Sequence, residues 1–490
     1  MAASGCPVQA AAKRLPMVLT STRPRTPPGP RGLPLVGILP RLARQRSLLT
    51  SLVELWQQYG DVVQAPVGTT TAILFTRPRA VQHVLSDHRD TYVRSPHQRN
   101  LAFRLLVGDS LLTSDGPVWR RHRRLVQAAL VGKALQAYAP RMTASIDDLL
   151  ELWDQRVQAG RDDIAVYREL GLLSLDILGR SVLGFDARTE ADDVGEMVGE
   201  LTRFARARLW GLIPPRLWFA TPGAGRFYAT RRRLLQRLES LIAVHRSPSN
   251  DASDDLVSTM LSARDEWGQP MSDRQLRDEL TTLYLAGHET TARLLTAVFY
   301  ALAHEPDVER QLHAELDAHL AGRTPTLADL PALPYTRAVV DEALRLYPPV
   351  PVLTKHALQD DVVDGYRVVG GALVVLSPYL TQRHPDVWPE PERFDPGRFV
   401  SAAAAIRRHR FAVFPFSAGS HSCPGASFAL QEARLAVAAI ASRFRLLPAS
   451  PEQPGSGVRQ CLELPNVHLR LVARPRASAR RMPLAAVVSD

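Results

Sequence analysis

Cys423 lies in a glycine-punctuated run, 416–425, that constrains this chain more than any other feature. An alanine-rich amphipathic segment, 426–444, follows the run and predicts a helix. A thiolate at the start of that helix would be stabilised by the helix dipole and by free backbone N–H groups. Gly419 and Gly425 lack a Cβ, so the backbone could approach the sulfur closely. The run predicts a low-pKa thiolate that suits a soft metal centre, and a buried structural cysteine is the alternative.

A second motif lies inside a long predicted helix, 273–304. Ser272 and Gln275 have the pattern of a capping box at its start, and Pro306 marks its end. The run 286–291 places a glycine close to two β-branched threonines, which is unfavourable for a helix. Such local conflicts tend to occur at functional positions. A loosely packed core helix is the alternative interpretation.

Two further patterns pair residues on one face of a predicted helix. Trp119 and Arg123 are four residues apart, and Glu342 and Arg345 are three apart. A basic surface helix and an exposed ion pair are the ordinary explanations of such spacings. Apolar residues flank Glu342, and a Pro-Glu-Arg-Phe run containing Arg393 follows further along the chain. These neighbours favour a buried position for the second pair.

Taken together and in this order, the four motifs resemble those of the cytochrome P450 family over about residues 27–473. The cysteine run is similar to the family's haem-binding loop at Phe416, Gly419, His421, Cys423 and Gly425. The resemblance implies that Cys423 is the axial ligand of haem b, iron protoporphyrin IX. Two positions depart from the commonest loop, because Ser417 replaces a glycine and His421 replaces an arginine.

The resemblance also implies how the haem propionates are held. Trp119 and Arg123 would hydrogen-bond a propionate, and Lys355 occupies a strand position where an arginine is usual. Lysine offers a point charge without the planar fork of arginine. The charge of His421 would depend on pH. We therefore expect two weakened propionate contacts.

The remaining motif residues receive catalytic or structural roles by the same resemblance. Thr290 would hydrogen-bond dioxygen, and Glu289 would relay protons. Arg393 would complete a buried triad with Glu342 and Arg345. NAD(P)H-derived electrons would arrive through a separate ferredoxin and reductase, since the chain carries no flavin or iron–sulfur motif. The expected reaction is a monooxygenation, in which one atom of dioxygen enters the substrate.

The substrate pocket is expected, by analogy, to draw on residues 94–112, 208–222, 279–291, 350–354 and 464–467. Its predicted lining residues are small or apolar: Leu101, Phe103, Leu283, Ala286, Gly287, Val350, Val352 and Leu353. We expect an apolar substrate such as a terpenoid, fatty acyl or polyketide-like compound. An apolar access mouth, or alternatively ordinary core, is predicted at Trp210, Leu212, Ile213, Trp218 and Phe219. Competing functions are a haem-thiolate peroxygenase, isomerase or oxidative-coupling enzyme, and a non-enzymatic haem sensor.

Charge and cysteine usage narrow the class of protein further. The formal net charge is +11, which raises nucleic-acid binding, but no nucleic-acid module is recognisable. Basic clusters at 120–124 and 407–410 instead predict docking of an acidic ferredoxin. Three cysteines cannot form a disulfide framework, and no run of 18 apolar residues exists. A cytoplasmic bacterial monomer without a transmembrane anchor is expected.

The hydrophobic periodicity predicts a mainly α fold with a small β subdomain, as in the cytochrome P450 fold. The predicted helices are 119–156 (broken at Pro140), 167–184, 192–210, 226–245, 273–304, 306–320, 335–346 and 426–444. The predicted strands are 61–75, 366–377 and 462–472. One domain, 27–473, is expected between a flexible segment, 1–26, and a disordered basic tail, 474–490.

Overall fold

The computed structural model describes residues 24–33, 36–44, 47–95, 101–183, 197, 199–204, 218, 221, 223–247, 255–400, 408–448 and 470–475. The predicted mouth residues Trp210, Leu212, Ile213 and Phe219 and the turn 464–467 lie outside this part of the chain. Arg25, within the segment predicted to be flexible, exchanges backbone hydrogen bonds with Gly365 and Arg367 at 2.9 and 2.8 Å.

Helices make up most of the described chain, which confirms the predicted class. The long helices are α5 (Gly116–Ala128), α6 (Gly132–Gln158), α7 (Val166–Leu178), α9 (Ala224–Arg246), α11 (Asp273–His304), α12 (Pro306–Leu320), α13 (Pro334–Leu346) and α17 (Ala426–Arg443). The shorter ones are α1 (Leu39–Arg44), α2 (Leu48–Tyr59), α3 (Pro78–Gln82), α4 (Leu101–Val107), α10 (Leu256–Ser262), α14 (Pro378–Thr381) and α15 (Gly397–Val400). Short segments of other helix types are η1 (His83–Asp87), η2 (Gly179–Leu183), η5 (Leu327–Ala332) and η6 (Gly419–His421).

The predicted break in the helix 119–156 exists, but not at Pro140. The chain leaves helical geometry between α5 and α6, where Gly132 adopts a left-handed φ of 60°. Pro140 lies inside α6, which continues through it to Gln158. A proline removes one backbone donor, and that loss is tolerated here because α6 packs along α17 and α7.

The small β region joins distant parts of the sequence in one mixed sheet. Its strand order is β1 (Val62–Val67), β2 (Thr70–Phe75), β8 (Leu373–Leu376), β5 (Leu353–Ala357) and β3 (Tyr92–Arg94). Strands β2 and β8 pair in parallel, whereas the other pairs are antiparallel. A second sheet has the order β4 (Asp163–Ala165), β10 (Arg470–Pro475), β9 (Phe444–Pro448), and β6 (Asp361–Val363) pairs with β7 (Tyr366–Val368).

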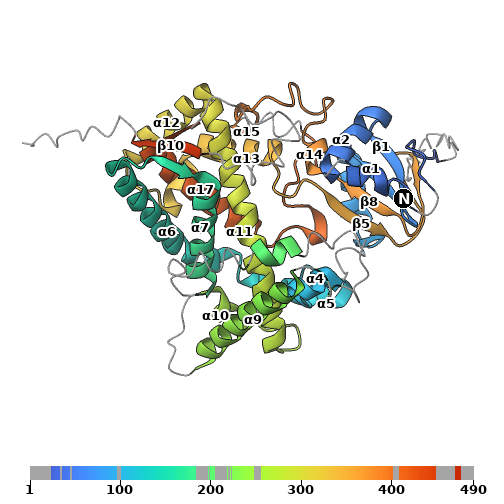
Figure 1. Ribbon diagram of the computed structural model, residues 1–490, viewed down its shortest axis with the longest axis horizontal. Helices are drawn as coiled ribbons and strands as arrows, with labels where there is room; N and C mark the ends of the chain where they lie inside the picture. Colours follow the sequence, from blue (N-terminus) through green and yellow to red (C-terminus); the bar gives the residue numbers. More distant parts are fainter. Residues whose placement is uncertain are drawn as a thin grey trace, which may run out of the picture.

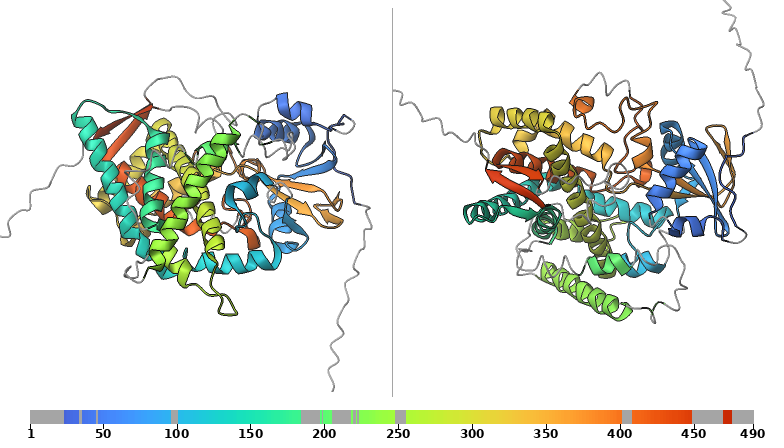
Figure 2. Two further views of the ribbon diagram at one scale, coloured as in Figure 1. Left: turned by 60° about the horizontal axis from the view of Figure 1, so that its bottom comes forward. Right: turned by 45° about the horizontal axis from the view of Figure 1, so that its top comes forward.

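Helix α11 runs through the middle of the molecule, with helices α6, α7 and α17 on one side and the five-stranded sheet at the other end (Figures 1 and 2). It packs against α7, α9, α13 and α17. Ser272 caps its first turn by accepting a hydrogen bond from the Gln275 backbone N–H at 3.3 Å. Pro306, which starts α12, prevents its continuation. The predicted limits of α11 and α12 are confirmed.

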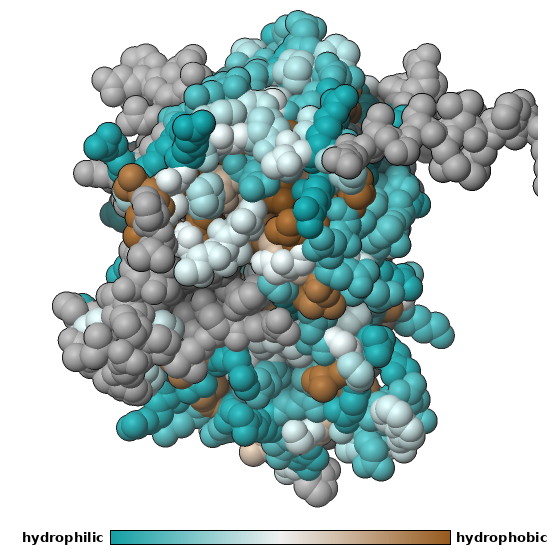
Figure 3. Space-filling view, turned by 90° about the vertical axis from the view of Figure 1, so that its right-hand side faces the viewer, coloured by the Kyte–Doolittle hydropathy of each residue, from teal (hydrophilic) through white to brown (hydrophobic). Residues whose placement is uncertain are grey.

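The outer face at the sheet end carries mostly hydrophilic side chains, with apolar patches that are separated from one another (Figure 3). The apolar residues of the sheet are turned inward, since Ile73, Phe75, Val374 and Leu376 are fully buried. This end of the molecule therefore has its own small core beside the larger helical core.

Candidate functional site

The loop that carries Cys423 is held by its own backbone. The Cys423 N–H donates to the Phe416 carbonyl at 2.8 Å, and the Ser422 N–H donates to the Gly419 carbonyl at 3.2 Å. Helix α17 begins three residues after the cysteine. The thiol is exposed, although protein surrounds it closely enough to desolvate it. The loop thus presents one reachable sulfur beside a helix N-terminus.

Two residues of this loop have left-handed backbone conformations. Gly419 has a φ of 67°, and a Cβ there would lie 1.7 Å from the Leu85 carbonyl oxygen. Ser417 has a φ of 60°, which is unfavourable for a residue with a side chain. A Cβ on Gly425 would meet the sulfur at an ordinary 4.0 Å. The prediction that both glycines let the backbone reach the sulfur is therefore wrong for Gly419, which makes room for η1, whereas the backbone of Gly425 does lie close to the sulfur.

The predicted low pKa of the Cys423 thiol is also wrong for the protein by itself. Burial raises the pKa of this thiol, against a hydrogen bond from the Gly425 backbone N–H and the charge of Arg123. These two groups favour the thiolate, but their effect on the pKa is smaller than that of burial. A metal bound to the sulfur would displace the proton, because metal-coordinated thiols are deprotonated.

The four predicted propionate-binding residues meet beside this loop. The rings of Trp119 and His421 lie 4.3 Å apart between centroids, and Lys355 Nζ lies 3.2 Å from His421 Nδ1. Arg123 donates to the Ser422 carbonyl. Residues from α5, β5 and the loop are thereby brought together from three distant parts of the sequence.

Two buried nitrogen atoms in this cluster, Trp119 Nε1 and His421 Nε2, have no hydrogen-bond partner among the residues that the structure describes. Asp115 Oδ1 lies 3.5 Å from the latter, which is longer than a normal N–H···O hydrogen bond. Lys355 faces His421 Nδ1, so the imidazole hydrogen belongs on Nε2. The cluster therefore presents two unsatisfied buried N–H donors.

Burial sets the charge states in this cluster. It lowers the pKa of Lys355 to about 8, and the charge of Arg94 acts in the same direction. Burial also lowers the pKa of His421, which nearby Asp115 opposes and Lys355 reinforces. This shift favours the neutral imidazole of His421, which can donate a hydrogen bond but carries no charge.

Sequence reasoning missed Arg94 and Asp115, which lie behind the cluster. The Arg94 backbone N–H donates to Asp115 Oδ2 at 2.9 Å, and its side chain donates to the carbonyls of Leu111 and Ser114. Arg94 is a buried cation at the end of β3. No sequence pattern indicated it, because its burial depends on the pairing of β3 with β5.

On α11, the run 286–291 is a continuous helix. The Thr290 hydroxyl donates to the Ala286 carbonyl at 2.6 Å, a contact that loosens a helix by competing for that acceptor. Glu289 accepts a hydrogen bond from Arg293 at 2.7 Å, an ion pair that sequence reasoning did not include. Ala286 is exposed in the middle of this long helix, so α11 faces an open space at this point.

The predicted pocket residues divide into three groups. Phe103, Leu283, Gly287, Val352 and Leu353 are half-buried, Ala286 and Val350 are exposed, and the side chain of Leu101 lies outside the described residues. Trp218, predicted at an access mouth, is only 3% exposed, which favours its alternative interpretation as core. A Cβ on Gly287 would approach the Leu178 side chain to 3.0 Å, so this glycine lets α11 pack closely on α7.

Glu342 and Arg345 form a fully buried ion pair, with two hydrogen bonds of 2.7 Å between their side chains. The prediction of a third buried side chain at Arg393 is wrong. The Arg393 side chain is 64% exposed and pairs with Glu390, and only its backbone carbonyl accepts from Arg345, at 3.0 Å. The third guanidinium is that of Arg398, 3.5 Å from Glu342 and 11% exposed.

These residues fit a haem group. Its anionic propionates would satisfy the unpaired N–H groups of Trp119 and His421 beside Lys355, and its iron would take the reachable thiol of Cys423. A family profile described as "Cytochrome P450" matches residues 27–465. This chain belongs to the cytochrome P450 family. The expectation raised by the four motifs is confirmed.

Relatives of this P450 include two from Streptomyces melanosporofaciens. "Cyclooctatin synthase" is 34% identical over 91% of this chain and 95% of its own length. "Cyclooctat-9-en-7-ol 5-monooxygenase" is 33% identical over 86% of this chain and 89% of its own length. The crystal structure of the cytochrome P450DA heme domain superposes with a TM-score of 0.80 at 26% identity, covering 93% of this chain and 99% of that one. The chain is thus a P450 monooxygenase with the fold of the family.

No helix within the described residues is both long and apolar enough to cross a bilayer.

Proposed function

We propose that this P450 inserts one oxygen atom into a terpenoid-like hydrocarbon. The relatives support this substrate class over the fatty acyl and polyketide alternatives, and the expected lining is compatible with any apolar substrate. The names of the two Streptomyces relatives refer to cyclooctatin and to a cyclic alkene alcohol. The side chains expected around the substrate, including Phe103, Leu283, Val352 and Leu353, are apolar and only half-buried. Such a lining favours a compact apolar ligand with few polar groups.

Haem b is the proposed cofactor, and when bound it supplies the activation of dioxygen. Cys423 would hold the iron, Trp119, Arg123, Lys355 and His421 would hold the propionates, and Phe416, Gly419 and Gly425 would shape the loop. Trp119 Nε1 and His421 Nε2 carry this proposal, because unpaired buried donors beside cations suit an anionic group. Lys355 and neutral His421 provide less positive charge than two arginines.

Glu289 and Thr290 are the proposed proton-handling residues. The Thr290 hydroxyl is bound to the Ala286 carbonyl, and its oxygen remains able to accept a hydrogen bond. Glu289 is held by Arg293, so it can deliver a proton toward Thr290 only when this ion pair opens. We infer that Arg293 controls how readily Glu289 exchanges protons with solvent.

Electrons derived from NAD(P)H are proposed to arrive through an acidic ferredoxin. Fewer arginines are available to contact it than the sequence indicates. Arg121 and Arg124 are paired with Asp265 and Glu266, both at 2.6 Å. Arg120, on the same helix, is exposed. Replacing it (R120E) is expected to raise the KM for ferredoxin several-fold at low salt, because steering by opposite charge is lost. The exposed Arg310 on α12 provides the charge-matched control, R310E; equal effects of both variants would count against docking at α5.

The function is tested with purified holoenzyme, a ferredoxin–reductase pair and isotopically labelled dioxygen. A red-shifted absorption band of the reduced carbon monoxide complex and one labelled oxygen atom in a cyclic terpene product are expected. Faster turnover with peroxide than with ferredoxin would instead favour the peroxygenase alternative. Binding of fatty acids but not cyclic terpenes would contradict the substrate class while leaving the monooxygenase reaction in place.

A further inference from the structure

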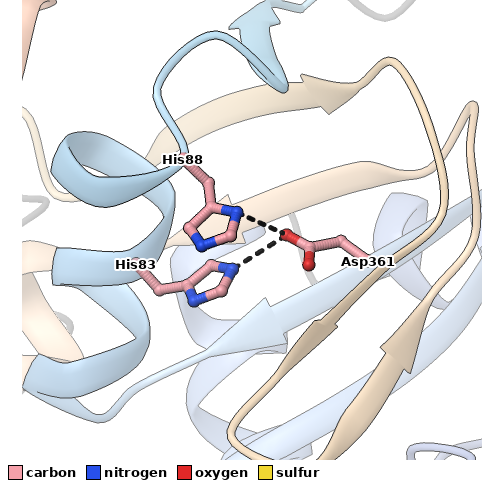
Figure 4. A group of neighbouring side chains, drawn as sticks. All are labelled: His83, His88 and Asp361. Atoms are coloured by element: carbon pink, nitrogen blue, oxygen red, sulfur yellow. Dashed lines mark hydrogen bonds and ion pairs between the residues drawn. The ribbon is translucent and has the colours of Figure 1, made fainter.

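His83, His88 and Asp361 are three potential metal ligands that lie together and are separate from the residues proposed to hold the haem. His83 Nε2 lies 2.8 Å and His88 Nδ1 lies 3.7 Å from the same atom, Asp361 Oδ2. The three donor atoms all lie within 4.8 Å of one another. Figure 4 shows both imidazole rings directed at the carboxylate from one side. Among the described residues, these three form a group of His, Cys, Asp or Glu side chains that could hold one metal ion.

The backbone of η1 produces this arrangement. η1 is a π-helical turn, and the His88 N–H donates to the His83 carbonyl at 2.9 Å, five residues back. Residues five apart therefore lie above one another, and the two rings stack with centroids 3.9 Å apart. In an α-helix, residues five apart would point in different directions. Single π-helical turns occur frequently at functional sites.

The carboxylate is oriented by the hairpin that carries it. Asp361 begins β6, and its Oδ1 accepts a hydrogen bond from the Val362 backbone N–H at 2.7 Å. Its Oδ2 accepts from the Tyr92 hydroxyl at 2.8 Å and faces both histidines. The neighbours of a metal ligand commonly hold it in this way. Asp361 is 15% exposed and His88 is 46% exposed, so an ion can reach the group from solvent.

We propose that His83, His88 and Asp361 form a binding site for zinc or a similar divalent transition metal. Two imidazoles and one carboxylate are a common zinc-binding set that leaves a fourth position to water. Ligand bonds of about 2.0–2.2 Å in a tetrahedral site place ligand atoms roughly 3.3 Å apart. The distances of 2.8 and 3.7 Å from Asp361 Oδ2 lie on either side of that separation. Binding requires one of the two stacked imidazole rings to rotate, so that the lone pairs of both point at the ion.

The bound ion would join the β6–β7 hairpin to η1. The Leu85 carbonyl of η1 lies against Gly419 of the Cys423 loop, where no Cβ fits.

The alternative is a hydrogen-bonded contact without a metal. The position of His88 distinguishes this alternative from a metal site. His83 and Tyr92 hold Asp361 at hydrogen-bond distance, whereas His88, at 3.7 Å, does not. A hydrogen-bonded contact therefore needs only His83 and Tyr92, whereas metal binding needs His88 as well.

The test is a zinc titration by isothermal calorimetry of tag-free holoenzyme after dialysis against EDTA, which leaves the porphyrin iron in place. We expect one saturable site, an affinity at least about tenfold lower in His88→Ala, and no change in His319→Ala, which removes an exposed histidine at the end of α12. His83→Gln, which keeps an N–H donor, is expected to weaken zinc binding as well.

Without zinc, His88→Ala should unfold at the wild-type temperature, and zinc should raise that temperature only in proteins with an intact site. Absence of a saturable site, or equal affinity in wild type and His88→Ala, would overturn the proposal.

Discussion

At the scale of single residues, the site contains conformations and unpaired groups that an ordinary core would not retain. Ser417 has a left-handed φ of 60° at a position where the family usually has glycine. Trp119 Nε1 and His421 Nε2 are buried without partners. Strain and unsatisfied donors of this kind cluster at sites that bind a group. The departures noted in the sequence thus have physical consequences for stability.

Ser417→Gly is expected to stabilise the protein by up to about 1 kcal/mol, because glycine adopts this φ without a Cβ penalty. The midpoint of urea unfolding of the holoenzyme measures the effect. Ser420→Gly, at a nearby loop position without a positive φ, is the matched control and should not stabilise. A lower midpoint for Ser417→Gly would show that its hydroxyl contributes more than its backbone costs.

Thr290→Ala is expected to keep the haem and the thiolate spectrum but to divert electrons into hydrogen peroxide. The variant loses the hydroxyl that bonds the Ala286 carbonyl and can accept a proton-relay hydrogen bond. The ratio of product to NAD(P)H consumed measures this coupling. Thr290→Ser, which retains the hydroxyl, should preserve most of it. Equal coupling in wild type and Thr290→Ala would refute the proposed role.

At the scale of elements, α13 depends on a buried ion pair. The third guanidinium beside it belongs to Arg398 and not, as the sequence predicted, to Arg393. Glu342 accepts from Arg345 and from the Asp395 backbone N–H at 2.9 Å. Arg345 also donates to the carbonyls of Gln382 and Pro391 at 2.9 and 2.7 Å. These bonds fill the donor positions of the guanidinium, which is what makes a buried charge tolerable. The Arg393 side chain takes no part.

Arg345→Ala is therefore expected to destabilise the protein by about 3–5 kcal/mol, since it leaves Glu342 buried without its main partner. Arg393→Ala should change the unfolding free energy by no more than about 0.5 kcal/mol, because its side chain is largely exposed. Urea unfolding of both variants provides the comparison. A similar loss of unfolding free energy in the two variants would support the predicted triad with Arg393.

At the scale of the whole molecule, Asp61 joins α2, the start of α3 and the segment that follows α14. It accepts from Trp56 of α2 at 3.0 Å, from Arg77 at 2.5 Å, and contacts His384, 323 residues away in sequence, at 2.8 Å. Burial alone would raise the pKa of Asp61, but hydrogen bonds from Trp56, His384 and Arg77 outweigh it and lower the pKa to about 2. The ionised carboxylate is thus favoured in the folded protein.

This lowered pKa gives a pH dependence with a definite sign. The stabilisation by Asp61 is fully present above its ordinary pKa of 3.8 and is lost as the pH falls toward about 2. Asp61→Asn should therefore destabilise at neutral pH, and its difference from wild type should shrink as the pH drops below about 5. Thermal unfolding between pH 7 and pH 3 measures this difference, with Asp307→Asn on the exposed face of α12 as control. A difference that stays constant with pH would exclude this electrostatic contribution.

Much of the helical framework was predictable because its signals are local. Ser272 and Pro306 are adjacent to the ends they determine, so 273–304 and 306–320 matched the structure. The helix α2 was missed although Ser47 caps its start and Gly60, with a φ of 89°, ends it. The strand β8 lies inside the predicted strand 366–377, whereas the bounds of β5 were not predicted, because its partners, β3 and β8, lie apart from it in the sequence.

The sequence by itself determined the family and the order of the motifs, and it predicted the cysteine ligand, because these depend on residue identity and spacing along the chain. Only the tertiary structure decided which polar groups are paired. In the folded protein, Lys355 and Arg94 are buried, Glu289 forms an ion pair with Arg293, and the Arg393 side chain is exposed. His83 also stacks on His88 over Asp361. Burial and pairing depend on contacts between segments that fold together from distant positions, and that information is not present in any local pattern.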